Sequence, residues 1–396
     1  MGYIAINPTT AGRGVALGAL VLVALAAGLS GCASSGSGIQ PGERVDVYVS
    51  APLHGSDAVN GRDVVDGARL ALADAEGEAG DLAVRATYLD DTAGKGSDAA
   101  WSPAVAAANA RRATQDSAAI AYIGDFSSGA TRSSLPITNE ARLLQVSPAA
   151  SAVDLVQPYL GAGDQMPDEV QPTGERTFGR VIPSDEAQAR AGAIWAKRLG
   201  SHGVMVIRGD SQYDNVIADA FAEEARAIGV QIAKSGPADI GYAAIEPSEL
   251  KRFDAVWVIP RVMASDALLT SLLPPALADG PRMLLLTSAA QDPSQLPPSG
   301  QRFLRGFRER YHREPGRYAA YGYEAMAVVL DSIQRAGDSG DDRDAVVDAF
   351  FDTTGQRSIL GTYSIDEVGN TTLDRLAGYQ VVNGQPRFET ALRASP

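Results

Sequence analysis

The sequence predicts an α/β fold made of two Rossmann-like, doubly wound units, each with a parallel sheet between layers of helices. Short apolar runs alternate with segments of helical period from Val45 onward. This alternation occurs twice, before residue 150 and again after residue 185. The 396 residues suffice for two domains of ordinary size, and 45% hydrophobic with 21% charged residues is typical of a globular protein.

The first series contains four expected strands that alternate with three expected helices. The strands are predicted at 45–49, 82–88, 119–123 and 143–146. The helices are predicted at 61–74, 103–114 and 130–141. Ser102 followed by Pro103 marks the start of the second helix, because Ser favours the N-cap and Pro the first helical position.

The second series repeats the pattern with two helices and four strands. Helices are expected at 185–199 and 215–228, the latter ended by Gly229 in a position that tolerates left-handed geometry. Strands are expected at 204–207, 230–233, 255–259 and 283–286. The segments 161–176 and 337–344 lack apolar periodicity and are expected to be surface loops.

The amino-terminal segment has the features of a secretion signal that ends in a lipidation site. Arg13 is the only charged residue among the first 31, and residues 15–28 form an apolar run too short to span a bilayer comfortably. Leu29-Ser30-Gly31-Cys32 resembles a bacterial lipobox, which predicts a signal peptide over 1–31, lipid on Cys32 and a flexible tether over 32–43. An ordinary cleaved signal or a single membrane helix is the alternative.

Charge and cysteine content exclude several classes of function. The formal net charge is −14 and basic residues form no cluster, so binding to nucleic acid or to anionic lipid through a basic face is not expected. Cys32 is the only cysteine, so no disulfide is expected.

Catalytic machinery and cofactor sites are not visible in the sequence. The histidines His54, His202 and His312 are scattered without metal-ligand spacing, and no phosphate loop or dinucleotide fingerprint occurs. Phe126 stands where a nucleophile elbow needs a glycine. His54 could border a binding site, although a solvated loop histidine is the simpler interpretation. We therefore expect no enzyme, no metal and no cofactor.

Two consecutive strand-to-helix crossovers carry the residues that could bind a ligand. In doubly wound sheets, ligands lie beyond the carboxyl ends of the strands, where helix amino termini present free NH groups. Ser128 follows the strand 119–123, and Ser151 follows the next strand. Each could offer a hydroxyl and a backbone NH to a carboxylate, or could simply cap its helix.

These two crossovers carry a resemblance to a known family. The segments 122–128, 135–141 and 146–151, with the tail 360–370, resemble the type I periplasmic binding proteins of the branched-chain amino acid group. The resemblance extends over nearly all of 45–387. It implies two lobes joined by a three-strand hinge, which close on a small molecule and deliver it to an ABC importer.

The resemblance also implies roles for individual residues. Ser128 and Ser151 would bind a ligand carboxylate, with Ser151 in place of the family's Thr, and the Ala150 carbonyl would bind an ammonium. Asp185 matches an Asp at the start of the second lobe, and Tyr213 matches a pocket tyrosine.

Two positions depart from the family's pattern. Asn60 occupies a first-loop position that is aromatic in the family, so a stacking surface is lost there. The family's amino-acid binders carry a Glu after the strand 283–286, whereas this chain reads Thr287-Ser288-Ala289-Ala290. A buried ammonium needs a charged partner, so the missing Glu weighs against a branched-chain amino acid as the ligand. It does not affect the expected fold. Arg261 could favour an acidic ligand or could simply be exposed.

We accordingly predict an extracytoplasmic, lipid-anchored solute-binding protein for an amino acid, an amide or a related carboxylate. Lobe 1 is expected at 44–180 plus 292–374, and lobe 2 at 181–291 plus 375–390. The expected partners are the small molecule, ABC permease subunits and the membrane through the lipid anchor, with the protein itself a monomer. A ligand sensor acting on a membrane kinase or a cell-wall enzyme is the alternative, because a fold alone does not separate transport from sensing.

Overall fold

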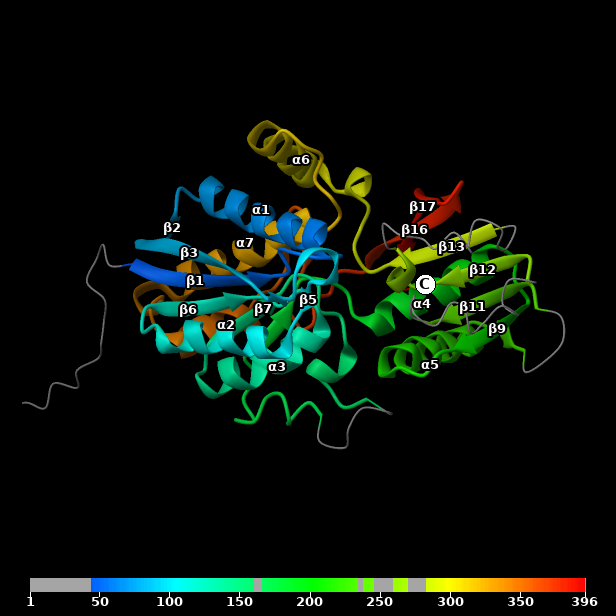
Figure 1. Cartoon of the computed structure of the whole chain (residues 1–396), viewed down its shortest axis with the longest axis horizontal. Helices are drawn as coiled ribbons and strands as arrows, with labels where there is room; N and C mark the ends of the chain where they lie inside the picture. Colours follow the sequence, from blue (N-terminus) through cyan, green and yellow to red (C-terminus); the bar gives the residue numbers. More distant parts are fainter. Residues whose placement is uncertain (1–43, 160–165, 234–237, 246–258, 270–282, 396) are drawn as a thin grey trace, which may run out of the picture. The chain divides into compact units, whose positions relative to one another are not determined.

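Six strands form the first sheet, in the order β2-β3-β1-β6-β7-β8 (Figure 1). The computed structural model describes residues 44–159, 166–233, 238–245, 259–269 and 283–395. All neighbours in this sheet are parallel except β2 and β3. The strands are β1 (Arg44–Ala51), β2 (Glu78–Ala79), β3 (Leu82–Asp90), β6 (Ala119–Ile123), β7 (Leu144–Ser147) and β8 (Phe178–Arg180).

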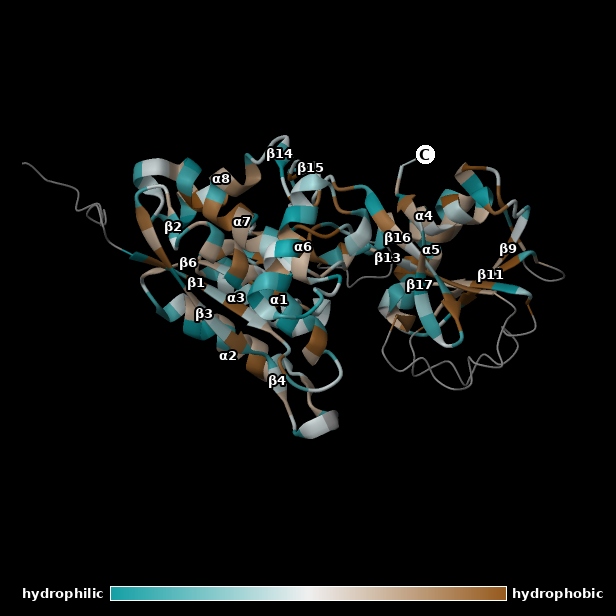
Figure 2. Cartoon of the chain, turned by 90° about the horizontal axis from the view of Figure 1, so that it is seen from above, coloured by the Kyte–Doolittle hydropathy of each residue, from teal (hydrophilic) through white to brown (hydrophobic). Residues whose placement is uncertain are grey.

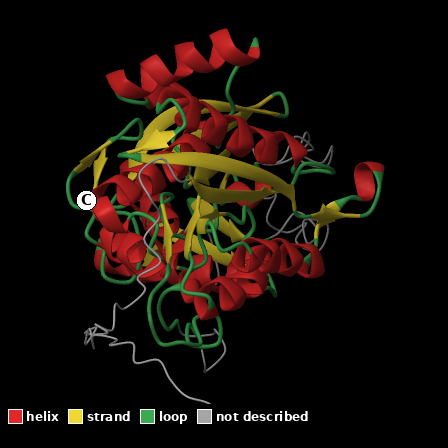
Figure 3. Ribbon diagram, turned by 90° about the vertical axis from the view of Figure 1, so that its left-hand side faces the viewer, coloured by secondary structure: helices red, strands yellow, loops and turns green. Residues whose placement is uncertain are grey.

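Helices cover both faces of this sheet, as the layers in Figure 3 show. On one face α1 packs against α7, which packs against α8; on the other face α2 packs against α3. The helices are α1 (Ala58–Asp74), α2 (Pro103–Gln115), α3 (Ser128–Glu140), α6 (Pro298–Tyr311), α7 (Ala319–Ala336) and α8 (Arg343–Phe351). Because β1 pairs with β3 on one side and β6 on the other, the chain order reverses at β1, where doubly wound folds bind ligands.

The second sheet has seven strands, in the order β10-β9-β11-β12-β13-β16-β17. Its first five strands are parallel, and the β16–β17 hairpin adds antiparallel strands at one edge. The strands are β9 (Gly203–Arg208), β10 (Gln231–Ile232), β11 (Ile240–Ala244), β12 (Arg261–Ala264), β13 (Met283–Ser288), β16 (Arg375–Val382) and β17 (Gln385–Arg393). Helices α4 (Asp185–Arg198) and α5 (Gln212–Ala227) pack against each other and against this sheet.

Short elements complete the described part of the chain. Two small antiparallel pairs are β4 (Thr92–Ala93) with β5 (Ala100–Trp101), and β14 (Gln356–Arg357) with β15 (Thr362–Tyr363). The 3-10 turns are η1 (Gly96–Asp98), η2 (Val153–Leu155), η4 (Asp266–Leu268), η6 (Pro293–Gln295) and η7 (Gly337–Ser339).

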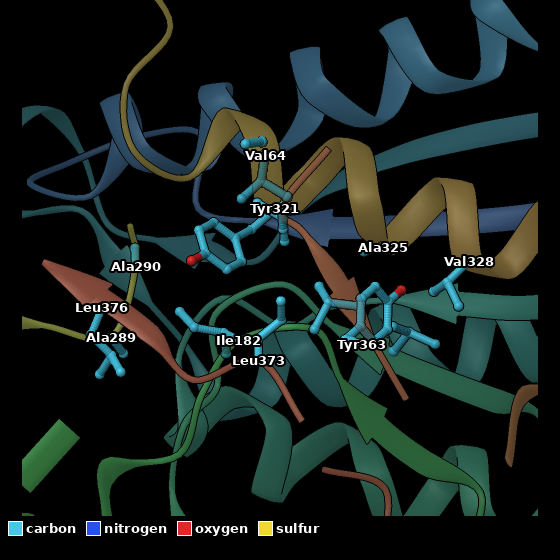
Figure 4. Packing of buried hydrophobic residues seen from close by; sticks show 14 of the residues in the cluster. Val64, Ile182, Ala289, Ala290, Tyr321, Ala325, Val328, Tyr363, Leu373 and Leu376 are labelled. Carbon is cyan, nitrogen blue, oxygen red and sulfur yellow. The ribbon is translucent and has the colours of Figure 1, made fainter. Parts of the chain in front are cut away.

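One large cluster of buried apolar side chains contains residues of both sheets. It includes Val47 of β1, Val204 of β9 and Leu376 of β16, together with Ile182 and Ala289, which lie on segments that connect the two sheets (Figure 4). The central strands are buried on both faces, whereas α1 alternates hydrophobic and hydrophilic residues and buries only one face (Figure 2). These patterns follow from a parallel sheet covered by helices on both sides.

The structure confirms the predicted α/β fold with two doubly wound units. The strands expected before residue 150 correspond to β1, β3, β6 and β7, and the glycine after α5, Gly229, has the left-handed φ of 82°. Helix α2 begins at Pro103 as expected, although the Ser102 side chain makes no capping hydrogen bond. No helix in the described ranges is long and apolar enough to span a bilayer.

Several expectations differ from the structure. The strand expected at 255–259 lies almost wholly outside the described residues; the strand found after it, β12, begins at Arg261. Strand β11 was not predicted, since Gly241 and two alanines give its segment weak strand character. Strand β17 was also missed, although Asn383 and Gly384 adopt φ of 51° and 71°, the geometry of a two-residue hairpin turn that an Asn-Gly pair favours. The loop expected to reach residue 344 ends earlier, because α8 begins at Arg343.

Candidate functional site

Ser128 stands at the amino terminus of α3 with its hydroxyl directed at the next crossover. The preceding residue, Ser127, is the N-cap, and its hydroxyl accepts from Gly129 N at 3.2 Å. Because Ser127 caps the helix, the Ser128 hydroxyl is left to accept from Ala152 N, also at 3.2 Å. An accepting hydroxyl keeps its own hydrogen for another acceptor, so Ser128 can still donate to a carboxylate.

The turn after β7 is held rigidly by side chains on both sides. The Ser147 hydroxyl accepts from Ala150 N at 2.8 Å, and the fully buried Arg180 donates through Nη1 to the Ala152 carbonyl at 2.7 Å. Arg180 Nη1 also lies 3.4 Å from the Ala150 carbonyl oxygen. Burial lowers the pKa of Arg180 to about 10, which leaves it cationic at neutral pH. The Ala150 carbonyl therefore already faces one cation of the protein.

Ser151 and Asp185 meet at the start of α4. Asp185 N donates to the Ser151 carbonyl at 2.9 Å, and the Ser151 side chain hydrogen-bonds the Asp185 carboxylate. Burial raises the pKa of Asp185 to about 6, with a further rise from Asp266 and opposing effects of Ser151, Arg180 and Arg132. Asp185 is 3% exposed, and its Oδ1 has no hydrogen-bond partner among the residues that the structure describes.

Tyr213 lies in the first turn of α5, whose N-cap Ser211 forms a capping box with Asp214. Its hydroxyl is 3.4 Å from Oδ1 of Asp266, in the turn that follows β12. Burial, and then the carboxylates of Asp266 and Asp185, raise the pKa of Tyr213 well above its ordinary value. Asp185 is thus close enough to Tyr213 for its charge to affect the pKa of the tyrosine, and Ser151 in turn contacts Asp185.

Asp266 is the main site residue that the sequence reasoning missed. Its Oδ1 accepts from Gln188 Nε2 at 3.0 Å, and its Oδ2 accepts from Ala289 N at 3.3 Å. The segment 287–290 contains no acidic residue, but the Asp266 carboxylate contacts its backbone. The signal was present, because Ser265-Asp266 directly follows the apolar residues of β12, but this strand had been expected at 255–259.

Asn60 lies in the first turn of α1 and not in a loop as expected, because α1 begins at Ala58. It is half-buried and makes no hydrogen bond through its side chain among the described residues.

Aromatic rings near Ser128 come from other elements. Trp101 of β5 lies so close to Gly129 that a Cβ there would be 2.5 Å from its ring, and Phe126 packs edge-on against Tyr318 with ring centroids 4.8 Å apart.

Other residues considered in the sequence lie apart from this group. His54 Nδ1 is 2.6 Å from Asp90 Oδ2, and its side chain is 70% exposed. Arg261 is the first residue of β12, at its amino end, and donates to the Leu199 carbonyl at 3.1 Å, so it lies away from the carboxyl ends of the strands. The described residues contain no group of three His, Cys, Asp or Glu arranged to hold a metal ion.

A cavity of about 340 Å³ lies elsewhere, next to α4, β16 and β17. Its apolar lining includes Ile194, Leu376 and Leu392, and its rim carries exposed arginines. None of the predicted site residues lines it. The convergence of hydroxyls and carboxylates described above, and not this cavity, has the polar groups that orient a small ligand.

A family model described as periplasmic binding protein matches residues 45–251, just over half of the chain. The chain belongs to the periplasmic binding protein family. This confirms the family predicted from the two crossovers. The family consists of extracytoplasmic solute-binding proteins and not of enzymes, as the missing catalytic constellations indicated.

Solved structures similar to this periplasmic binding protein share its fold. A leucine-binding protein of Thermotoga maritima is 23% identical with a TM-score of 0.67, over 88% of this chain and 99% of that one. A branched-chain amino acid binding protein of Streptococcus pneumoniae, in complex with isoleucine, is 19% identical with a TM-score of 0.64, over 88% and 98%. A solute-binding protein of Rhodopseudomonas palustris in complex with p-hydroxybenzoic acid is 18% identical with a TM-score of 0.68, over 89% and 98%. A search among curated proteins finds no match.

Proposed function

We propose that this periplasmic binding protein captures a small carboxylate-bearing molecule between two lobes and delivers it to an ABC importer while anchored by lipid at Cys32. The observation that carries the proposal is the convergence of two crossovers. The Ser128 hydroxyl accepts a hydrogen bond from Ala152 N at 3.2 Å, and the Ser151 carbonyl accepts one from Asp185 N at 2.9 Å. Groups from both doubly wound units thus meet at one place.

The first unit supplies the donors for a ligand carboxylate. Ser128 begins a helix of 13 residues, whose amino terminus carries a partial positive charge and free NH groups. Its hydroxyl hydrogen can point at the anion, and that of Ser151 can do so when it leaves the Asp185 carboxylate that it contacts in this structure. Trp101, Phe126 and Tyr318 would supply apolar surface beside it.

The second unit supplies Asp185 and Tyr213, which the ligand would contact from the other side. Contacts that exist only when both units touch the ligand stabilise a closed form over an open one. Asn60, in the first turn of α1, is proposed as a further contact at the border of the site. The boundaries proposed for the lobes remain 44–180 plus 292–374, and 181–291 plus 375–390.

A ligand screen tests the binding role. Thermal unfolding of the protein is measured with amino acids, amides and small carboxylates, where a ligand at a hundred times its Kd stabilises by about 2.7 kcal/mol. We expect Ser128→Ala with Ser151→Ala to weaken binding of any hit more than about tenfold, since each removes a hydrogen bond to a charged group. Ser133→Ala is the control, because that hydroxyl bonds within α3 to Gly129 O. An unchanged Kd in the double variant would refute the site.

The lipid anchor and the delivery step need separate tests. Residues 1–43, including Cys32, lie outside the described residues. Metabolic labelling with a radioactive fatty acid should label the wild type and not Cys32→Ser, and the variant should leave the membrane fraction. Uptake of the bound solute should fall in cells without this protein. Normal uptake, with a changed response to the solute, would favour the sensor instead.

A further inference from the structure

Arg180 has the largest fully buried side chain in the described part of the chain. It is the last residue of β8, and the connection 181–184 leads from it to α4. Its side-chain hydrogen bonds within the described ranges all go to neutral oxygens, and the carboxylates whose charges act on it, Asp185 and Asp366 first, are not among its hydrogen-bond partners. A buried cation without a carboxylate in direct contact is costly, which indicates a role for Arg180 beyond stability.

One nitrogen of the guanidinium supports the turn 149–152, which carries groups proposed to bind the ligand. Nη1 donates to the Ala152 carbonyl at 2.7 Å and lies 3.4 Å from the Ala150 carbonyl oxygen. Ala152 N in turn donates to the Ser128 hydroxyl at 3.2 Å, and Ser151 lies between the two supported carbonyls. The position of Nη1 therefore affects the geometry around both serines.

The other two nitrogens bond the connection 364–374, which leads to β16 of the second sheet. Nε and Nη2 donate to Asn370 Oδ1, at 2.8 and 2.6 Å. Asn370 is itself fixed, because its backbone N donates to Asp366 Oδ1 at 2.7 Å and its Nδ2 donates to Asp366 Oδ2 at 3.2 Å. One side chain thus joins the turn 149–152 to a segment that connects the two sheets.

The arrangement needs the shape of a guanidinium as well as its charge. A guanidinium presents five N–H donors in fixed directions within one plane, whereas a lysine presents three donors from a single nitrogen. Segments that connect two lobes change their backbone angles when the lobes move. Since Asn370 lies on such a segment, that motion would shift its bonds with Arg180, and Arg180 would act on the turn.

We propose that Arg180 is a positioning residue that couples the turn 149–152 to the hinge, with Asn370 as its contact on the connection 364–374. The guanidinium gives the turn its binding geometry while the connection holds Asn370 against it. This inference rests on the proposed function and adds a control of that site from the hinge. Asn370 then influences ligand binding, although within the described structure it hydrogen-bonds none of the residues proposed to touch the ligand.

Hydrogen exchange of the ligand-free full chain tests the coupling at the amides of Ala150 and Ala152. We expect Asn370→Ala to speed their exchange by about tenfold, because the turn loses a support that depends on charge-assisted hydrogen bonds. Arg180→Lys, which keeps the charge but not the planar fork, should have the same effect. The double variant should add little to either, since both changes break one connected network.

Asn109→Ala is the matched control. This half-buried asparagine of α2 also makes two side-chain hydrogen bonds within the first unit, to Ser50 Oγ at 3.1 Å and to the Asp90 carbonyl at 2.9 Å. It should destabilise the protein in urea to a similar extent and leave exchange of the turn unchanged. Unchanged exchange at the turn in Asn370→Ala, or an equal rise throughout the first sheet, would overturn the proposal. If Arg180→Lys does not fold, Asn370→Ala alone decides.

Ligand affinity gives the second readout, with L-leucine and p-hydroxybenzoate as probes in calorimetry. For a probe that the wild type binds, we expect Asn370→Ala to weaken binding by about tenfold and Asn109→Ala to keep the Kd within about threefold, because a looser turn must be ordered on binding. An unchanged Kd in Asn370→Ala would overturn the proposal and leave the proposed function intact. If the wild type bound neither probe, the proposed function would lose support, and the exchange experiment, which uses no ligand, would still decide the coupling.

Discussion

Asp91, at the carboxyl end of β3, gives the clearest prediction about stability. Its side chain is fully buried, and in the described part of the chain neither carboxylate oxygen has a hydrogen-bond partner on another residue. Burial raises its pKa to about 8, and the nearby charges of Asp125, Asp90 and Asp57 add to the rise. The carboxyl is therefore protonated in the folded protein at neutral pH.

The sign and size of the effect follow from linkage between protonation and folding. A carboxyl whose folded pKa exceeds its unfolded value of 3.8 stabilises the folded state fully below pH 4, and loses that contribution as the pH rises through 8. One pKa unit is worth about 1.4 kcal/mol, so this carboxyl accounts for a loss on the order of 5 kcal/mol between pH 4 and pH 8. Asp91→Asn removes the titration and keeps the shape.

Urea unfolding of the wild type and Asp91→Asn at pH 5, 6, 7 and 8 measures this contribution. We expect the free energy of unfolding of Asp91→Asn, relative to that of the wild type, to increase as the pH rises. The increase should be about 2 kcal/mol or more between pH 5 and pH 8. Asp81→Asn, which changes an exposed carboxyl just before β3, should follow the wild type. Parallel curves for Asp91→Asn and the wild type would refute the argument from burial.

Three further predictions concern the site and the second sheet. Affinity for an amine-bearing ligand should rise between pH 5 and pH 7, because the pKa of Asp185 is about 6 and a cation binds the ionised carboxylate more tightly. The charged groups that act on Asp185 are Arg180, Arg132 and Asp266. A flat pH profile in calorimetry would contradict this prediction. Phe221→Ala should destabilise the protein by about 3–5 kcal/mol in urea unfolding, because the ring is fully buried and stacks on Tyr242 with centroids 3.7 Å apart; a loss below about 1 kcal/mol would contradict that packing. Gly384→Ala should cost about 1–2 kcal/mol, since φ is 71° there, whereas Gly306→Ala, in the interior of α6, should not destabilise; equal effects would contradict the hairpin geometry.

Much of the first doubly wound unit was predictable from the sequence. Its strands are uninterrupted apolar runs, and the serines of its crossovers stand at fixed offsets from strand ends, so local spacing alone placed Ser128 at the start of a helix. The second unit was less predictable. Gly241 and the alanines of β11 carry little strand preference, and β12 begins at Arg261, outside the apolar run at 255–259 that the sequence favoured.

What the sequence by itself determined is therefore the fold class, the family and the place of Ser128 at the start of a helix, because these depend on patterns within about 10 to 20 neighbouring residues. What only the tertiary structure decided is which carboxylate lies beside the 287–290 segment. Asp266 contacts the backbone of Ala289 and the side chains of Gln188 and Tyr213, residues from three other elements of the second unit. Parallel strands end at the same edge of the sheet, so a carboxylate that one loop lacks can come from the end of the neighbouring strand. The two positions are distant in the sequence, and local sequence patterns therefore do not predict this contact.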